Sequence, residues 1–142
     1  MIWGVLQFPG SCDERDALNA CTIASGGFGG HAKLVWHEET DLSGFDGIVV
    51  PGGFSYGDYL RAGAIARFAP AMEAVADFAA AGGPVLGICN GFQVLCESGL
   101  LPGALLTNES TRFICRQGDL IVQESDSLFL TGYEAGERIS IP

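Results

Sequence analysis

The chain has 142 residues, the length of a single domain with a substantial hydrophobic core. Seven Lys and Arg against 17 Asp and Glu give a net charge of −10, which argues against binding to nucleic acid or to an anionic membrane, because both need clustered cations. A hydrophobic share of 48% excludes intrinsic disorder. The 21 glycines, about twice the usual share, indicate many tight turns.

The cysteines are odd in number and form no C-x-x-C pair, which argues against a disulfide framework or a zinc site. They are Cys12, Cys21, Cys89, Cys96 and Cys115. No basic segment precedes a long apolar stretch at the N-terminus, so we expect no signal peptide. The longest uncharged apolar window, 78–89, is well short of the roughly 20 residues that a bilayer requires. These features predict a cytoplasmic protein with no membrane contact.

Short apolar runs alternate with longer amphipathic segments over the first hundred residues. The sequence predicts strands at 2–8, 33–36, 47–50 and 84–88, and helices at 13–25, at 59–81 with a break at Pro70, and at 90–98. Ser11 and Glu14 have the spacing of a capping box for the first helix. The alternation predicts an α/β fold with a doubly wound, mostly parallel sheet.

The pattern changes after Pro102. Short β-prone runs follow at 112–116, 120–124 and 138–141, and we expect them to be antiparallel additions to the sheet. The chain stops inside the last run without a cap or a polar tail. We therefore expect residues 1–142 to form one domain that is C-terminally incomplete.

The strongest local signal is Gly87-Ile88-Cys89-Asn90-Gly91, between an apolar strand and a helix. It has the spacing of a nucleophile elbow, with Cys89 at the nucleophile's position, Gly87 and Gly91 permitting the sharp turn, and the helix N-terminus favouring a thiolate. The backbone N–H of Asn90 can donate to an oxyanion. A buried core cysteine followed by a glycine-bounded turn remains an alternative.

The segment from Pro51 to Asp58 follows the third strand, so it lies at the same carboxyl edge of the sheet as Cys89. Its consecutive glycines let backbone N–H groups face a ligand, which makes Gly53 a second oxyanion donor beside Asn90. A plain loop is the alternative. A phosphate cradle is disfavoured because no Gly-Lys-Ser/Thr follows. Asp58 and Arg61 are expected to form a solvated pair.

A thiolate and two oxyanion donors still require a proton donor for the leaving group. The chain has only two histidines. His31 lies between the first helix and the second strand, and His37, beside two glutamates, is interpreted as a bystander. Cys21, Cys96 and Cys115 are interpreted as packing residues, whereas Cys12 lies at the edge of the site. The scattered acidic residues predict no metal site.

Four segments together resemble a known family. They are Phe8 to Ser11 (FPGS), Pro51 to Gly63 (PGGFSYGDYLRAG), Gly87 to Gln93 (GICNGFQ) and Leu101 to Leu105 (LPGAL). They resemble the glutaminase subunits of phosphoribosylformylglycinamidine synthases, which are class I, triad-type glutamine amidotransferases with a flavodoxin-like sheet. The elbow is shared by that whole class, and the long Pro51–Gly63 run is more specific.

The resemblance implies that Cys89 attacks the side-chain amide of L-glutamine, giving a thioester and ammonia. Gly53 and Asn90 would form the oxyanion hole, and Gly52, Phe54 and Gln93 would contact the glutamine. Ammonia would pass to a large synthetase subunit that makes formylglycinamidine ribonucleotide in purine biosynthesis, with a small accessory subunit in the same complex. ATP and magnesium would bind to that partner, and this chain would hold no cofactor.

The family's catalytic His and Glu lie in a His-Pro-Glu segment near the C-terminus that these 142 residues do not contain. We therefore expect this form to be an impaired glutaminase. Two other classes remain open. One is a cysteine hydrolase or redox-sensing protein of the glutaminase-like fold, and the other is a non-catalytic module that binds a partner.

Overall fold

The structure is a computed structural model that describes residues 1–26, 30–123 and 126–141. The chain divides into two compact units, Met1–Leu105 and Leu106–Pro142, and each is described by itself. Among the described residues, no helix is both long enough and apolar enough to cross a bilayer.

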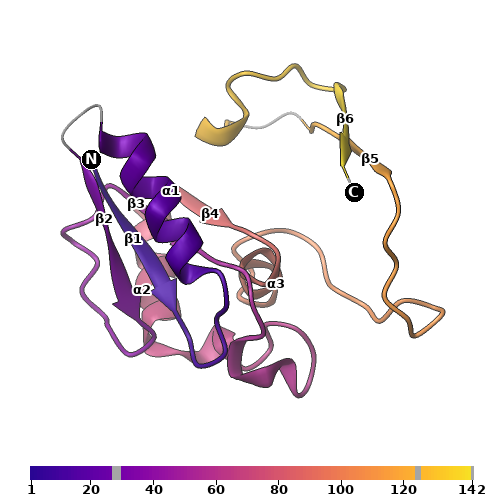
Figure 1. The fold of residues 1–142 in the computed structure, drawn as a ribbon, viewed down its shortest axis with the longest axis horizontal. Helices are drawn as coiled ribbons and strands as arrows, with labels where there is room; N and C mark the ends of the chain where they lie inside the picture. The colour runs from indigo at the N-terminus through magenta and orange to yellow at the C-terminus, as the bar shows by residue number, and fades with distance from the viewer. Residues whose placement is uncertain (27–29, 124–125, 142) are drawn as a thin grey trace. The chain divides into compact units, whose positions relative to one another are not determined.

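The first unit is built from alternating strands and helices (Figure 1). In the part of the chain that the structure describes, these are β1 (Ile2–Gln7), α1 (Glu14–Gly26), β2 (His31–Trp36), β3 (Gly47–Val50), α2 (Pro70–Ala80), β4 (Val85–Gly87) and α3 (Asn90–Glu97). The four strands are all parallel and pair in the order β2-β1-β3-β4. The predicted mostly parallel α/β sheet is confirmed.

The connections run outward from the middle of the sheet in both directions. From β1 the chain crosses through α1 to β2, and from β3 it crosses through α2 to β4, so right-handed crossovers place α1 and α2 on opposite faces (Figure 1). The order reverses between β1 and β3. Open α/β sheets bind ligands at the carboxyl edge beside such a reversal, and the segments after β1, β3 and β4 all begin at that edge.

The core explains why β3 is apolar along its whole length. All four of its residues are buried, because helices cover both faces of the sheet. Ile48 and Val50 belong to a buried cluster that includes Met72 and Val75 of α2. This packing fixes the start of the loop that follows Val50.

The predicted helix over 59–81 is wrong in its first half. Only α2 is α-helical there, and it begins at Pro70, whose fixed φ suits the first helical position. Before it lie two short 3-10 turns, η1 (Ser55–Asp58) and η2 (Ala66–Phe68). Gly63 separates them with φ +78, a value that does not continue a helix.

The predicted capping box of α1 is also wrong. The helix begins at Glu14, so Ser11 lies too far upstream to cap it, and its hydroxyl accepts from the Phe8 N–H at 2.9 Å. The backbone N–H groups of Cys12 and Asp13 both donate to the Gly52 carbonyl, at 3.2 and 3.3 Å. The loop after β1 is thus tied to the loop after β3.

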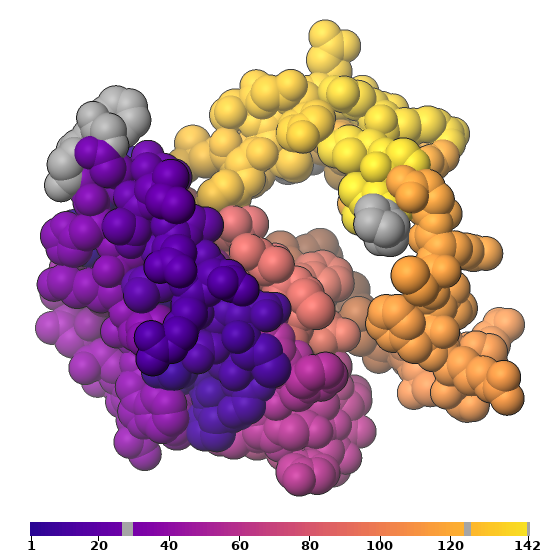
Figure 2. All heavy atoms as spheres, in the orientation of Figure 1, coloured from indigo at the N-terminus to yellow at the C-terminus, as the bar shows by residue number. Residues whose placement is uncertain are grey.

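The second unit contains β5 (Gly118–Ile121) and β6 (Arg138–Ile141), which pair antiparallel. The antiparallel strands predicted near the C-terminus are confirmed, but they form a sheet of their own instead of joining the parallel sheet, because a β-prone pattern does not say which strand will be the partner. The predicted strand at 112–116 is not formed. Residues 106–121 are exposed throughout, and Figure 2 shows the first part of this segment as a narrow run of atoms. Of the predicted run 120–124, residue 124 lies outside the described residues.

Candidate active site

Cys89 lies at the turn between β4 and α3, immediately before the helix. Its backbone has φ 52° and ψ −111°, a combination that costs an L-residue roughly 1–3 kcal/mol. Its side chain is exposed. The alternative of a buried core cysteine is therefore wrong. The strained turn holds the sulfur at the carboxyl edge of the sheet.

The two flanking glycines make this turn possible. A Cβ on Gly91 would lie 1.8 Å from the Val50 carbonyl oxygen, and one on Gly87 would lie 2.6 Å from Leu95 Cδ1 and 2.8 Å from the Phe92 nitrogen. Any side chain at either position would push α3 away from β3 and β4. The glycines predicted from the elbow spacing thus let α3 pack directly on these strands.

The glycine loop after β3 lies against Cys89. A Cβ on Gly52 would lie 3.4 Å from Cys89 Cβ and 2.3 Å from Asp13 Oδ2, so the elbow and the loop after β1 both approach Gly52 closely. Gly53 has φ +143, and a Cβ there would lie 2.6 Å from the Cys12 nitrogen. The segments after β1, β3 and β4 therefore meet at one place, as predicted from the sheet.

The hydrogen bonding around Gly53 leaves its N–H available. Gly53 and Ser11 form an isolated antiparallel bridge in which the Phe54 N–H donates to the Gly10 carbonyl at 2.9 Å and the Cys12 N–H donates to Gly52. In such a bridge the N–H of the central residue points away from the opposite strand. Within the described residues, neither the Gly53 N–H nor the Asn90 N–H has a hydrogen-bond partner.

The side chain of Asn90 is buried and links the elbow to the glycine loop. Its Oδ1 accepts from the Ser55 N–H at 3.0 Å and from the Ser55 hydroxyl. Its Nδ2 donates to both carboxylate oxygens of Asp58, at 3.2 and 3.3 Å, and to Gln93 Oε1 at 3.1 Å. The sequence did not predict that Ser55 and Asp58 bind the Asn90 side chain, because only the fold brings these distant residues together.

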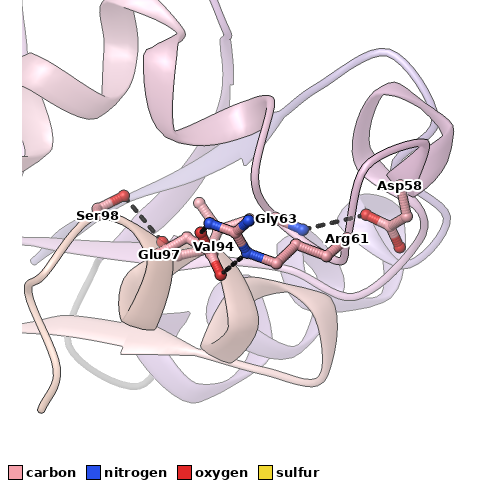
Figure 3. A network of polar contacts seen from close by, with 6 residues as sticks. All are labelled: Asp58, Arg61, Gly63, Val94, Glu97 and Ser98. Atoms are coloured by element: carbon pink, nitrogen blue, oxygen red, sulfur yellow. Dashed lines mark hydrogen bonds and ion pairs between the residues drawn. The ribbon is translucent and has the colours of Figure 1, made fainter. Parts of the chain in front are cut away.

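The expected solvated pair between Asp58 and Arg61 is wrong. Asp58 accepts from Asn90 and, at 3.2 Å, from the Gly63 N–H, whereas Arg61 makes two hydrogen bonds of 2.7 Å to Glu97 near the end of α3 (Figure 3). This bidentate pair ties the loop to α3 a second time. The hydrogen bonds from Arg61 lower the pKa of Glu97 below its ordinary value of 4.5.

Replacing Arg61 with glutamine is expected to lower the free energy of unfolding at pH 7 and to have little effect at pH 2.5. Glu97 has a lower pKa in the folded protein, so its contribution is present above about 4.5 and is lost as the pH falls through the folded-state pKa. Urea denaturation of both proteins at the two pH values measures this. Arg138→Gln, which removes an exposed pair to Asp119 at 3.6 Å, is the control and should show no such difference. Equal losses at both pH values would contradict the assignment.

The two histidines lie in different surroundings. His31 begins β2, at the amino edge of the sheet, opposite to the site. His37 follows β2 at the carboxyl edge, where its Nδ1 forms a 2.7 Å hydrogen bond with the Tyr56 hydroxyl. Burial, and secondarily the charge of Glu38, raises the pKa of Tyr56. Among the contacts of the described residues, neither histidine pairs with Cys89.

The cysteines differ in exposure. Cys12, Cys89 and Cys115 are exposed, so the interpretation of Cys115 as a packing residue is wrong. Cys21 and Cys96 are half-buried, and desolvation raises the pKa of both thiols. The exposed thiols are therefore the ones that a soluble reagent should reach first.

Comparison with known proteins matches these features to a family. The model of the CobB/CobQ-like glutamine amidotransferase domain matches residues 3–142. A phosphoribosylformylglycinamidine synthase subunit PurQ from Rhodococcus jostii is 56% identical over 139 residues, covering 98% of this chain and 60% of that protein. One from Rhodopseudomonas palustris is 58% identical, covering 97% of this chain and 58% of that protein.

A solved structure agrees with the sequence relatives. The structure of PurLQS from Thermotoga maritima contains a chain that matches with a TM-score of 0.83 and 44% identity, over 99% of this chain and 64% of that one. The chain thus spans about three fifths of the length of the relatives it matches. On the match over residues 3–142, the chain belongs to the family of CobB/CobQ-like glutamine amidotransferase domains.

Proposed function

We propose that this chain carries the nucleophile and the oxyanion hole of a glutaminase that hydrolyses L-glutamine to glutamate and ammonia. The observation that carries the proposal is the exposed Cys89 at a strained elbow, beside a glycine loop, with the unpartnered N–H groups of Gly53 and Asn90 on the two flanking segments. Acyl-transfer chemistry requires this combination of a nucleophile and paired N–H donors.

The reaction has two stages. The Cys89 thiolate attacks the amide carbon of the glutamine side chain, and the negative oxygen of the tetrahedral intermediate accepts from the Gly53 and Asn90 N–H groups. The intermediate collapses as the amide nitrogen takes a proton from solvent, which replaces the proton that the Cys89 thiol lost to solvent, and leaves as ammonia, giving a γ-glutamyl thioester. Water then attacks the thioester carbon, which releases glutamate and the thiol.

The remaining residues would hold the glutamine. Gly52 lies next to Cys89, and the Phe54 side chain is exposed on the same loop. The Oε1 atom of Gln93 accepts from Asn90, which leaves the N–H groups of its side chain able to donate to the substrate. We assign these three residues to substrate binding.

The relatives suggest where the ammonia goes. The proteins of 56–58% identity are subunits of phosphoribosylformylglycinamidine synthase, and the similar solved chain is part of a PurLQS complex. We propose that the chain docks to a large synthetase subunit, with a small accessory subunit in the complex, and supplies ammonia for formylglycinamidine ribonucleotide in purine biosynthesis. ATP and magnesium would act on the synthetase.

Two further properties belong to the same proposal. The family match spans both compact units, which supports one glutamine amidotransferase domain over residues 1–142. All five cysteines are free thiols, which fits the reducing cytoplasm where soluble biosynthetic complexes work.

The 142-residue form is expected to hydrolyse glutamine about 10²- to 10⁴-fold more slowly than a relative with a complete triad, the usual value of general acid–base assistance. His31 lies at the wrong edge of the sheet, and His37 is engaged by Tyr56. Ammonia release, measured with and without a purified synthetase partner, tests this. A rate near that of the relative would contradict it, and loss of that rate in His37→Ala would then identify His37 as the proton donor.

Labelling of Cys89 distinguishes this function from the two alternatives. Diazo-oxo-norleucine, an electrophile derived from glutamine, is expected to modify Cys89 selectively, and excess glutamine should slow the reaction. Mass spectrometry locates the label. Reaction of Cys89 with peroxide but not with this reagent would favour a redox-sensing protein. Binding to a synthetase, with turnover unaffected by Cys89→Ala, would favour a non-catalytic module.

A further inference from the structure

The side chain and the backbone of Asn90 face two different parts of the site. Its backbone N–H begins α3 beside Cys89, and its side chain, in a residue that is only 3% exposed, reaches into the glycine loop. A primary amide has two N–H donors and two acceptor lone pairs. Here Oδ1 accepts twice from Ser55, and Nδ2 donates to Asp58 and Gln93, so the whole capacity is used.

Resting on the proposed glutaminase function, we propose that Ser55 and Asp58 are positioning residues that act through the Asn90 side chain to hold the two oxyanion donors in register. Ser55 is two residues after Gly53, the other proposed donor. The Ser55 N–H and hydroxyl both donate to Asn90 Oδ1. Asn90 therefore supplies one oxyanion donor with its backbone and, with its side chain, anchors the segment that carries the other donor, Gly53.

Asp58 holds this arrangement against backbone strain. Tyr56, Gly57 and Asp58 have φ values of 53°, 76° and 51°, three consecutive residues in the left-handed region, of which only the glycine adopts it freely. Such a conformation persists where surrounding contacts over-determine it. The contacts are the hydrogen bonds that the Asp58 carboxylate accepts from Asn90 Nδ2 and from the Gly63 N–H, and the hydrogen bond between Tyr56 and His37. Figure 3 shows the bond from Gly63 to Asp58.

The charge on Asp58 also fixes which way the Asn90 amide faces. A carboxylate accepts only, so it selects the N–H side of the amide, while the Ser55 N–H selects the oxygen side. In a flipped amide, Asn90 Oδ1 would face the Asp58 carboxylate, and Asn90 Nδ2 would face the Ser55 N–H, so neither hydrogen bond could form. Asp58 thus determines a single orientation of Asn90, and through Ser55 it limits how far the Gly53 segment can move.

Loss of Asp58 or Ser55 is expected to affect the transition state more than substrate binding. The oxyanion forms only during reaction, so a displaced donor lowers kcat while KM changes little. Losing an oxyanion donor costs about 10²- to 10³-fold, so displacing one should cost about ten- to a hundredfold in kcat. We expect this from Asp58→Ala and Ser55→Ala, with KM changed by less than about threefold.

The experiment compares these variants with conservative and neighbouring ones, in complex with the synthetase partner. Asp58→Asn keeps an acceptor and should recover part of the kcat lost in Asp58→Ala. Arg61→Gln perturbs the same loop without touching Asn90 and should retain kcat. Alkylation of Cys89 by iodoacetamide, which forms no oxyanion, should proceed at the wild-type rate in all four. Unchanged kcat in Asp58→Ala, or equal losses in Asp58→Ala and Arg61→Gln, would overturn the proposal.

Amide hydrogen exchange tests the same claim without turnover. In Asp58→Ala, the N–H groups of Ser55 and Gly63 should exchange at least about tenfold faster, since each is held by the network, while the amides of β3 keep their protection. Unchanged exchange would overturn the positioning role even in an active enzyme. If the wild-type complex hydrolyses no glutamine, the proposed function fails, and this measurement still decides whether the network holds the loop.

Discussion

Replacing Cys89 with alanine is expected to abolish the glutamine hydrolysis that this chain retains, lowering ammonia release to near the uncatalysed background. Cys89 is the proposed nucleophile, and without it the γ-glutamyl thioester does not form at the elbow. Ammonia release in the proposed complex with a synthetase measures the loss, and if the complex forms as proposed, synthesis from added ammonium salt should be unaffected. Cys115→Ser, which removes another exposed thiol, is the matched control and should keep full turnover.

Glycine at position 89 is expected to give a more stable protein than alanine at the same position. Cys89 has φ 52° and ψ −111°, which glycine adopts without a Cβ clash. The free energy of unfolding of Cys89→Gly, measured by urea denaturation, should therefore exceed that of Cys89→Ala by about 1 kcal/mol, the lower end of the usual cost of such backbone strain. Equal stability of the two variants, or activity in the alanine variant, would contradict a strained nucleophile elbow.

The sequence predicts the positions of β1, β3, β4 and α3 to within a few residues, for a physical reason. A strand covered on both faces must be apolar throughout, so β3 at 47–50 is recognisable without knowledge of its neighbours. The run at 84–88 is equally apolar, although β4 is an edge strand with half-buried residues. The elbow is equally local. Gly87 and Gly91 border Cys89 within five residues, and the clashes that exclude a side chain there arise from α3, β3 and β4 themselves.

The contacts that hold the glycine loop are not local, and the sequence did not indicate them. Ser55 and Asp58 bond to Asn90 across 35 and 32 positions of chain. A polar residue in a glycine-rich loop is compatible with solvent contact, and nothing within the loop shows that an amide will be buried beside it. Likewise, the pattern over 59–69 suits a helix, but Gly63 has a positive φ and lies where its backbone closely approaches Val94, a contact that the local sequence does not indicate.

The C-terminal third shows the same limit for strands. The run at 112–116 has β propensity, but a strand forms only where another strand supplies its hydrogen bonds, and these residues are exposed. The run at 138–141 is a strand because β5 pairs with it in register, Gly118 opposite Ile141 and Ile121 opposite Arg138. Propensity locates candidate strands, and pairing decides which of them form.

Replacing Gly91 with alanine is expected to destabilise the fold and to lower kcat together. The new Cβ would lie 1.8 Å from the Val50 oxygen and 2.5 Å from its carbonyl carbon, and backbone atoms cannot yield as a side chain does. That oxygen also accepts from the Ile88 N–H at 3.0 Å, so the β3–β4 pairing is strained as well. Overpacking of this kind costs about 1–3 kcal/mol or more, measurable by urea denaturation.

Gly91→Ala should also lower kcat, because Val50 leads directly into the glycine loop. The next residues in the chain are Pro51, Gly52 and Gly53, so a shift of α3 away from Val50 separates the Asn90 N–H from the Gly53 N–H. A misplacement of about 1 Å can cost about 10²-fold in rate. Gly44→Ala is the control, because its Cβ would meet no atom within 4 Å, and both stability and kcat should stay near wild type. If Gly91→Ala loses stability but keeps its kcat, the packing of α3 on β3 does not set the spacing of the two donors.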